Sequence, residues 1–471
     1  MLTLADPRPS RHCQGLARRE FLKIGALGSL GLGSMLTLPQ LIAAKASGSP
    51  LVRDKSVVLL FLSGGPSHIE FFDPKMSAPS EYRSVTGELP TTHAGITFGG
   101  TFPQLAARAD QFSIVRSYGS GNSGHTYESV TTAGNSLKSA MSAIYARVAG
   151  VNHPQTGIPN NILVLPEAVK ENLKIGSNFE TGALPTLTQP GDLGPSYAAF
   201  NPAGGGQLKE NLELKIPAER LLDRRNLLAG LGQMKRAVER TAVVKGTDEF
   251  QQQALDVITR GVAQAFDLRQ ESQATLDRYD TEKLFPLAEV QRWYDMKRAT
   301  NLLGRQMLLA RRLCEAGCGF VTVSDCGWDM HSNENSPKFL GGMQPLGRQV
   351  DQAVSAFIDD VRERGLEDKI LLVVTGEMGR TPRINRNGGR DHYGDLTPLL
   401  LFGGGLKMGQ VIGQSDGKAE RAATTPFRPQ HLMMTIMNVL FDMGLLRLQT
   451  NIPRDIAKLG ETANPIDGLL S

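Results

Sequence analysis

Cysteine is scarce in this sequence, with only four residues among 471. Cys13 lies in an N-terminal segment that we expect to be removed, which leaves Cys314, Cys318 and Cys326. An odd number of cysteines in a chain of this length excludes a framework of disulfides. A cysteine-rich zinc site would need a fourth ligand that this spacing does not offer. We therefore expect Cys314 and Cys318, which flank a predicted helix end, to line the core.

The sequence also lacks a strong net charge and long apolar runs. The formal net charge is +4, and the basic residues are scattered along the chain. Because a nucleic-acid surface needs basic residues clustered on one face, this distribution argues against a nucleic-acid partner. Beyond residue 46, no segment is apolar for long enough to span a bilayer. The sequence contains no internal repeat and no low-complexity segment.

Residues 1–46 have the features of a twin-arginine export signal. Arg18 and Arg19 are followed by Phe21 and Leu22, a mildly apolar stretch and the small-residue site Ala44-Lys45-Ala46. A retained membrane anchor is the alternative, but the repeated glycines and the small residues at the end favour cleavage. We therefore expect the twin-arginine export machinery as a partner, and the periplasm or cell envelope as the location.

Residues 47–471 have the pattern of a single α/β domain. Continuous apolar runs without alternation, such as SVVLLFLS at 56–63 and ILLVVT at 370–375, are typical of strands covered on both faces. Amphipathic helices lie between them, including one at 346–365 that ends at a glycine. Alternating strands and helices predict a doubly wound, mainly parallel sheet, with a helical insertion at about 207–300.

Candidate metal ligands follow several predicted strands. In a parallel sheet the carboxyl ends of the strands meet at one edge, where ligands bind. Histidine and carboxylate side chains gathered there suit a divalent cation: zinc, with manganese, calcium or iron as alternatives. Each histidine could instead be a core or capping residue, and each acid could cap a helix or pair with arginine. The candidate ligands are His68, Asp73, Asp329, His331, Glu377, Asp391 and His392.

Candidate catalytic residues lie in NSGHT, at 122–126, and in GEMGRTP, at 376–382. A helix predicted to begin near His125 would favour an anion at its start, where Ser123, His125 or Thr126 could act as the nucleophile. An ordinary serine or threonine N-cap is the alternative for either hydroxyl. Arg380 could bind phosphate or sulfate oxygens bidentately, or pair with an acid.

Several motifs together resemble an exported bacterial family, domain-of-unknown-function family 1501. They are FLSGGPSHIEFFDPK, LLARRLCEAGCGFVTV, GWDMH, GEMGRTPRINRNGGRDHY and GGGLKMGQVIGQSD, in addition to the twin-arginine start. The resemblance extends from the signal nearly to the C-terminus. That family is similar in fold to the alkaline phosphatase and sulfatase superfamily, so the resemblance implies an alkaline-phosphatase-like sheet.

The superfamily resemblance also implies roles for particular residues. Asp329 and His331 match an Asp-His metal pair, Glu377 a later acid and His392 the last histidine. Ser123, His125 or Thr126 falls where the nucleophile belongs. The sequence departs from the pattern at Met378, where a histidine is expected, and at Ser63-Gly64-Gly65, where an acid is expected; His68 or Asp73 could compensate. Two functions are consistent with this pattern. The first is a metal-dependent hydrolase of small or polymeric phosphate or sulfate esters. The second is a non-catalytic envelope protein that binds an anionic glycan or partner through a degenerate metal site.

Overall fold

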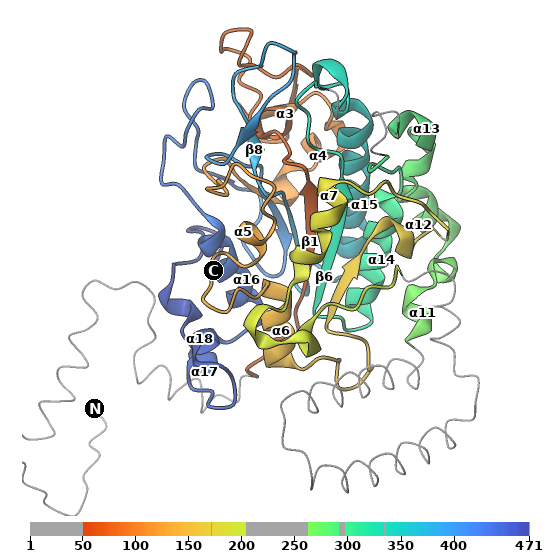
Figure 1. Cartoon of the computed structure of the whole chain (residues 1–471), viewed down its shortest axis with the longest axis vertical. Coiled ribbons are helices and arrows are strands. Elements are labelled where there is room, and N and C mark those ends of the chain that lie inside the picture. The colour runs from red at the N-terminus through yellow and green to blue at the C-terminus, as the bar shows by residue number, and fades with distance from the viewer. Residues whose placement is uncertain (1–49, 171, 204–261, 292–296, 334–335, 471) are drawn as a thin grey trace, which may run out of the picture.

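The computed structural model describes residues 50–170, 172–203, 262–291, 297–333 and 336–470. The central feature of this part of the chain is a seven-stranded sheet with the order β11-β4-β10-β7-β1-β6-β5 (Figure 1). β10 is antiparallel to its neighbours β7 and β4, and the other pairings in this sheet are parallel. The strands are β1 Ser56–Ser63, β4 Ser113–Val115, β5 Asn161–Val164, β6 Phe320–Cys326, β7 Ile370–Thr375, β10 Leu400–Gly403 and β11 Val411–Ile412.

Two short antiparallel pairs lie outside the main sheet. β2, Glu88–Pro90, pairs with β3, Thr97–Gly99. β8, Gly379–Arg380, pairs with β9, His392–Tyr393. The second pair is a small hairpin inserted between β7 and β10, and it carries residues of the candidate site.

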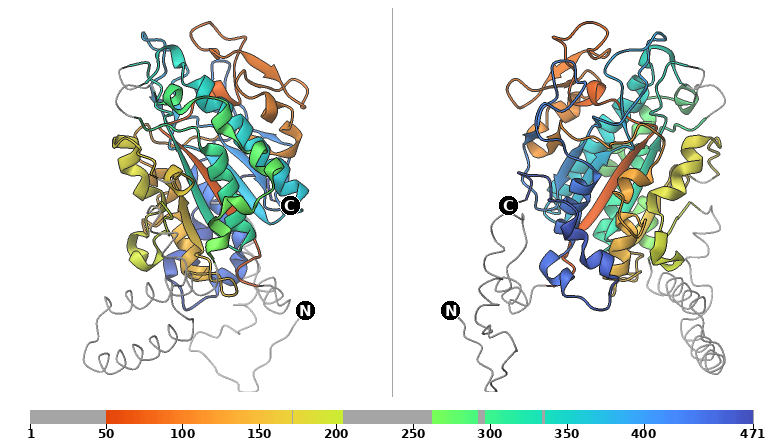
Figure 2. Two further views of the ribbon diagram at one scale, coloured as in Figure 1. Left: turned by 90° about the vertical axis from the view of Figure 1, so that its right-hand side faces the viewer. Right: turned by 60° about the vertical axis from the view of Figure 1, so that its left-hand side comes forward.

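Helices cover both faces of the sheet (Figure 2). The longer ones are α6 Met141–Ala149, α14 Leu303–Glu315, α15 Arg348–Glu363 and α16 Pro429–Leu440. The shorter ones are α3 His68–Phe71, α4 Pro103–Ala106, α5 Glu128–Thr131, α7 Phe179–Ala183, α11 Ala263–Phe266, α12 Gln273–Arg278, α13 Leu287–Val290, α17 Met443–Arg447 and α18 Arg454–Ala457. α15 ends before Gly365, whose φ of +66° suits the left-handed position after a helix.

The lack of alternation in β1 follows from this two-sided cover. Val58, Leu60 and Leu62 belong to the core cluster that contains residues of α14 and α15. Val57 and Leu59 belong to the opposite cluster, with residues of α6 and α16. Because successive side chains of a strand point to opposite faces, a strand buried on both must be apolar throughout. The expected α/β class with a mainly parallel sheet is confirmed.

One expectation about helices is wrong, and a second falls largely outside the described residues. The helix predicted to begin near His125 begins at Glu128 instead and has four residues. Asn122 and Gly124 form a turn before it, in which the Asn122 side chain accepts a hydrogen bond from the Gly124 N–H at 2.7 Å. The predicted insertion at 207–300 lies partly outside the described residues. Its described parts are 262–291 and 297–300, and the first holds the short helices α11, α12 and α13 and two 3₁₀ turns at Leu268–Gln270 and Thr281–Lys283.

The three cysteines beyond residue 46 are free and buried, and Cys314 and Cys318 line the core as expected. Burial raises the pKa of the Cys318 thiol to about 12. Among the described residues, no helix combines the length and apolarity needed to cross a membrane. The N-terminal signal predicted at 1–46 lies outside the described residues.

Candidate metal centre

The site begins where β1 and β6 end side by side. Ser63 pairs with Cys326 at the last register position, and the Trp328 N–H donates to the Ser63 carbonyl at 3.1 Å. Gly64 follows with a φ of +113°, and a Cβ there would lie 2.5 Å from the backbone nitrogen of Asp329. The two turns therefore approach too closely for any side chain at this position. This contact requires a glycine at a position where the superfamily resemblance implied an acid.

Asp329 is the centre of a group of histidines. Its Oδ1 lies 3.0 Å from His331 Nε2, 3.1 Å from His392 Nε2 and 3.6 Å from His125 Nε2, and Arg380 contacts the same oxygen. Burial alone would raise the pKa of Asp329. The hydrogen bonds from His331 and His392 and the charge of Arg380 outweigh that effect and hold the pKa well below its usual range. Asp329 is therefore ionised.

Two of the histidines have a carboxylate on the ring nitrogen that faces away from Asp329. His125 Nδ1 lies 2.9 Å from Glu377 Oε1, and His331 Nδ1 lies 2.8 Å from Asp391 Oδ1. An ionised carboxylate can only accept, so when the His125 ring is neutral its proton belongs on Nδ1, which leaves a lone pair on Nε2. Burial lowers the pKa of His331, but its hydrogen bonds to Asp329 and Asp391 outweigh that effect and raise it, because the ring lies between two carboxylates. Carboxylate–histidine pairs of this kind orient imidazoles that bind metals.

His125, Asp329 and His392 form the group best placed to hold a cation. Their ligand atoms all lie within 4.8 Å of one another. Next to them Glu377 is fully buried, and its Oε2 has no hydrogen-bond partner among the described residues. Buried carboxylate oxygens without a partner are costly unless a charge or a donor satisfies them. Two imidazoles and one carboxylate, with a second carboxylate alongside, fit a zinc-type cation.

Arg380 is a buried component of this site. β8 and β9 pair Arg380 directly with His392. Its guanidinium donates to the carbonyls of Gly64 and Gly65 and to Asp329, and its NH1 lies 3.3 Å from His331 Nε2. These contacts direct its donors at the protein, so Arg380 holds Asp329 and the turn after β1 in place. The structure does not aim it at open space, where the predicted anion clamp would need it.

The remaining candidate residues lie apart from this group. His68 is buried and has its Nε2 3.1 Å from the carbonyl of Ala419. Asp73 contacts Ser415 and forms an ion pair with Lys75 at 3.1 Å. Ser123 is exposed and Thr126 is half-buried, whereas His125, between them, faces the candidate ligands. Of the sequence-predicted nucleophiles, the structure thus brings only His125 to the site, among the candidate ligands.

Residues of α7 support the site and were not anticipated from the sequence. Glu180 accepts a hydrogen bond from the Gly327 N–H at 2.8 Å and pairs with the buried Arg298 at 2.9 Å. Burial raises the pKa of Glu180 to about 8, although Arg298 opposes that shift. The Phe179 ring packs on His125 with 4.5 Å between centroids. No spacing signal could reveal these contacts, because α7 and β6 are far apart in the chain.

The fold and this site define an α/β protein with a candidate metal centre at the carboxyl edge of a mainly parallel sheet. The chain belongs to the family described as a protein of unknown function, DUF1501, whose model matches residues 54–451. The resemblance to that family is thereby confirmed. A comparison with the curated proteins finds no match.

Solved structures show weaker likenesses. The PsFucS1 sulfatase from Pseudoalteromonas sp. has 11% sequence identity and a TM-score of 0.33, over 90% of this chain and 72% of that protein. The phosphonate monoester hydrolase SpPMH from Silicibacter pomeroyi has 12% identity and a TM-score of 0.30, over 82% of this chain and 73% of that protein. Because these TM-scores are low, we base the functional proposal on the geometry of the site.

Proposed function

We propose that the protein is a metal-dependent hydrolase of phosphate or sulfate esters. The observation that carries the proposal is the convergence of His125, Asp329 and His392 within 4.8 Å of one another. Catalytic zinc sites have three protein ligands and keep one position open for water or substrate, whereas structural sites have four. A three-residue set is therefore the arrangement that hydrolysis needs.

A divalent cation in this position would act as a Lewis acid toward an ester oxygen and lower the pKa of a water molecule. The residues of the chain prepare the site for it. Glu377 and Asp391 orient the rings of His125 and His331 so that their Nε2 atoms face Asp329, and Arg380 helps to hold Asp329 ionised. Three carboxyl groups, those of Asp329, Glu377 and Asp391, lie at the site beside the one guanidinium, a composition that favours a cation.

We further propose a single cation and a water nucleophile. Arg380 supplies Asp329 with the positive charge that a second cation would otherwise provide. Met378, where the superfamily pattern has a histidine, is buried against the turn at Gly65. No hydrogen bond joins the Ser123 or Thr126 hydroxyl to a candidate ligand in the described part of the chain, so a water is the better candidate nucleophile.

The alternative is a protein that binds an anionic glycan or partner through the same site without turnover. The position of Arg380 favours it, because its donors are bound to protein groups and leave none directed at a substrate oxygen. The two functions differ in a simple observable. A hydrolase releases product in proportion to its metal content, whereas a binder releases none at any metal loading.

The test is hydrolysis of aryl phosphates and aryl sulfates by protein carrying zinc, manganese, calcium or iron. We expect turnover with at least one metal, its loss on chelation, and its recovery when that metal is restored. The variant His392→Ala should lose turnover, and His153→Ala, a histidine away from the site, should keep it. A metal-loaded wild type that hydrolyses none of these esters would favour the binder instead.

A further inference from the structure

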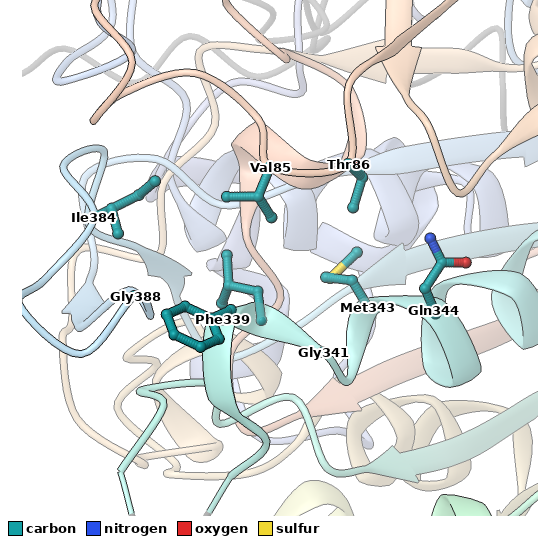
Figure 3. Close-up of a pocket in the computed structure, with 9 residues that line it drawn as sticks. Val85, Thr86, Phe339, Gly341, Met343, Gln344, Ile384 and Gly388 are labelled. Carbon is teal, nitrogen blue, oxygen red and sulfur yellow. The ribbon is translucent and has the colours of Figure 1, made fainter.

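A second feature of this edge of the molecule is an apolar pocket with a volume of about 410 Å³ (Figure 3). Pockets that hold small organic ligands have volumes of roughly 300–1,000 Å³. Three segments of the chain surround it, one after α3, one before α15 and one in the loop of the β8–β9 hairpin. The lining residues are Val85, Thr86, Phe339, Leu340, Gly341, Met343, Gln344, Ile384 and Gly388.

The lining is apolar but open to solvent. Val85 is 45% exposed and Phe339 is 74% exposed, and both belong to the few large hydrophobic side chains that are exposed in the described part of the chain. Only Thr86 and Gln344 contribute polar side chains to the pocket. Exposed apolar side chains gathered around a hollow are typical of a binding site.

The backbone under Phe339 is strained. Phe339 and Leu340 have φ values of +54° and +56°, a region that bulky residues rarely adopt. Strain of this kind costs about 1–3 kcal/mol per residue and is concentrated at functional sites. The Ser332 hydroxyl accepts from the Leu340 N–H at 3.4 Å, and the Phe339 ring packs closely over Gly388. The chain thus holds an aromatic ring at the pocket against its local preference.

The loop that supplies Ile384 and Gly388 to the pocket packs directly against the backbone of His331, a residue of the candidate metal centre. A Cβ on Gly389, next to the pocket residue Gly388, would lie 2.2 Å from the carbonyl carbon of His331. Asn385, next to Ile384, donates to the His331 carbonyl at 3.0 Å and to Asp391 Oδ1 at 2.9 Å. A group bound in the pocket would therefore lie beside the loop that supplies His392.

The wall formed by Val85 and Thr86 is joined to the β8–β9 loop through a buried ion pair. The N–H groups of Val85 and Thr86 donate to the Glu70 carboxylate, which pairs with Arg390 at 3.1 Å. Arg390 and Glu70 side chains are fully buried, and Arg390 directly precedes Asp391. The segment at Val85 and Thr86 is thus joined through Glu70 and Arg390 to the loop that carries Asp391 and His392.

We propose that this pocket binds the apolar, aryl-sized alcohol part of the ester whose anionic group lies at the metal centre. The inference rests on the proposed function and names its substrate class. A sugar would need hydrogen-bond partners for each of its hydroxyls, and only two side chains of the lining, Thr86 and Gln344, are polar. An aromatic or branched alkyl group instead matches the chemistry of the walls.

Binding of 2-naphthol to the exported protein tests the proposal without any need for turnover. We expect fluorescence titration to show saturable binding that weakens about tenfold or more in Phe339→Ala and in Ile384→Ser. Leu448→Ala, which changes another exposed hydrophobic side chain far along the chain, should bind as the wild type does. Because Phe339 is largely exposed, its variant should fold, and circular dichroism checks this.

Further measurements distinguish this inference from the proposed function. If 2-naphthyl phosphate or sulfate is hydrolysed, Phe339→Ala should lower kcat/KM for the naphthyl ester about tenfold. The kcat/KM for the corresponding methyl ester, which has no aryl group to bind, should be unchanged. If no ester is hydrolysed, pocket-dependent naphthol binding still supports the pocket, and only the hydrolase proposal fails. Equal naphthol binding by the wild type and both variants would overturn the inference. A wild-type dimer that Phe339→Ala converts to a monomer would also overturn it, because the pocket would then bind a second copy of the chain.

Discussion

At the scale of single residues, the site is organised by what each carboxylate does to its neighbour. Glu377 and Asp391 do not share one function with Asp329, because each faces the outer nitrogen of a histidine. Asp329 faces the inner nitrogens and is the carboxylate nearest to the position of a cation. Removal of an outer carboxylate should thus weaken metal binding without removing a ligand of the three-residue group.

We therefore predict that Glu377→Gln weakens zinc affinity about 10- to 100-fold, the usual effect of losing a hydrogen-bond partner of a metal-binding histidine. Competition with a chromophoric chelator measures the change. Glu289→Gln, on an exposed position, is the matched control and should leave the affinity unchanged. An unchanged affinity in Glu377→Gln would show that His125 needs no orientation from this carboxylate.

A second residue-scale prediction concerns acid stability. Burial lowers the pKa of His68 to about 4 from its ordinary 6.5, so between these values the unfolded chain binds a proton that the folded chain does not. Stability should consequently fall as the pH decreases from 6.5 to 4, by about 3 kcal/mol from this residue alone. Urea unfolding at several pH values should show a flatter profile in His68→Gln than in the wild type. Equal slopes in the wild type and in His68→Gln would contradict the assignment.

At the scale of elements, the turns after β1 and β6 decide where the ligands lie. Gly64 brings the two turns into contact, and the β8–β9 hairpin then aligns Arg380 with His392. These turns contain no regular structure, yet they fix the distance between Asp329 and the sheet. A change in their backbone should affect metal binding as well as stability.

The pair of variants Gly64→Ala and Gly87→Ala separates those two effects. Both glycines have positive φ, at +113° and +79°, but only at Gly64 would a Cβ meet other atoms. Gly87→Ala should lower the free energy of unfolding by roughly 1–2 kcal/mol through backbone strain alone. Gly64→Ala should cost about 1–3 kcal/mol more through the clash, and should also weaken zinc binding. If both variants had equal effects on the free energy of unfolding and on zinc affinity, the close approach at Gly64 would be unimportant.

The elements differ in how far the sequence predicts them. The apolar run of β1 and the amphipathic pattern of α15 are local signals, and the structure has both elements. The direction of β10 is not a local property, because it depends on the β8–β9 hairpin that returns the chain to the ligand edge. His392 precedes β10 and lies at that edge. Because β10 runs antiparallel to β7, β10 begins at the edge where β7 ends. The Glu180–Gly327 contact had no sequence signal, because it joins segments about 150 residues apart.

At the scale of the whole molecule, the proposed location depends on the first 46 residues and the proposed chemistry on the remainder. Twin-arginine export carries folded proteins, so a cation could be bound before the chain leaves the cytoplasm. We propose this route and the periplasm or cell envelope as its destination. The proposal depends on the Arg18-Arg19 pair, which the export machinery reads.

Replacement of both Arg18 and Arg19 by lysine should keep the precursor in the cytoplasm. Fractionation followed by immunoblotting measures the distribution, and Arg8→Lys, which lies before the pair, should be exported as the wild type is. Normal export of the double variant would remove the twin-arginine assignment and leave the metal centre unaffected.

The most direct test of the metal centre is anomalous X-ray scattering from crystals of the zinc-loaded protein. We predict one zinc peak at the carboxyl edge of the sheet, about 2.0–2.2 Å from His125 Nε2, Asp329 and His392 Nε2. The peak should vanish in crystals of Asp329→Asn grown under the same conditions. A map without a peak at these three residues, or one with an equal peak in Asp329→Asn, would contradict the proposed metal centre.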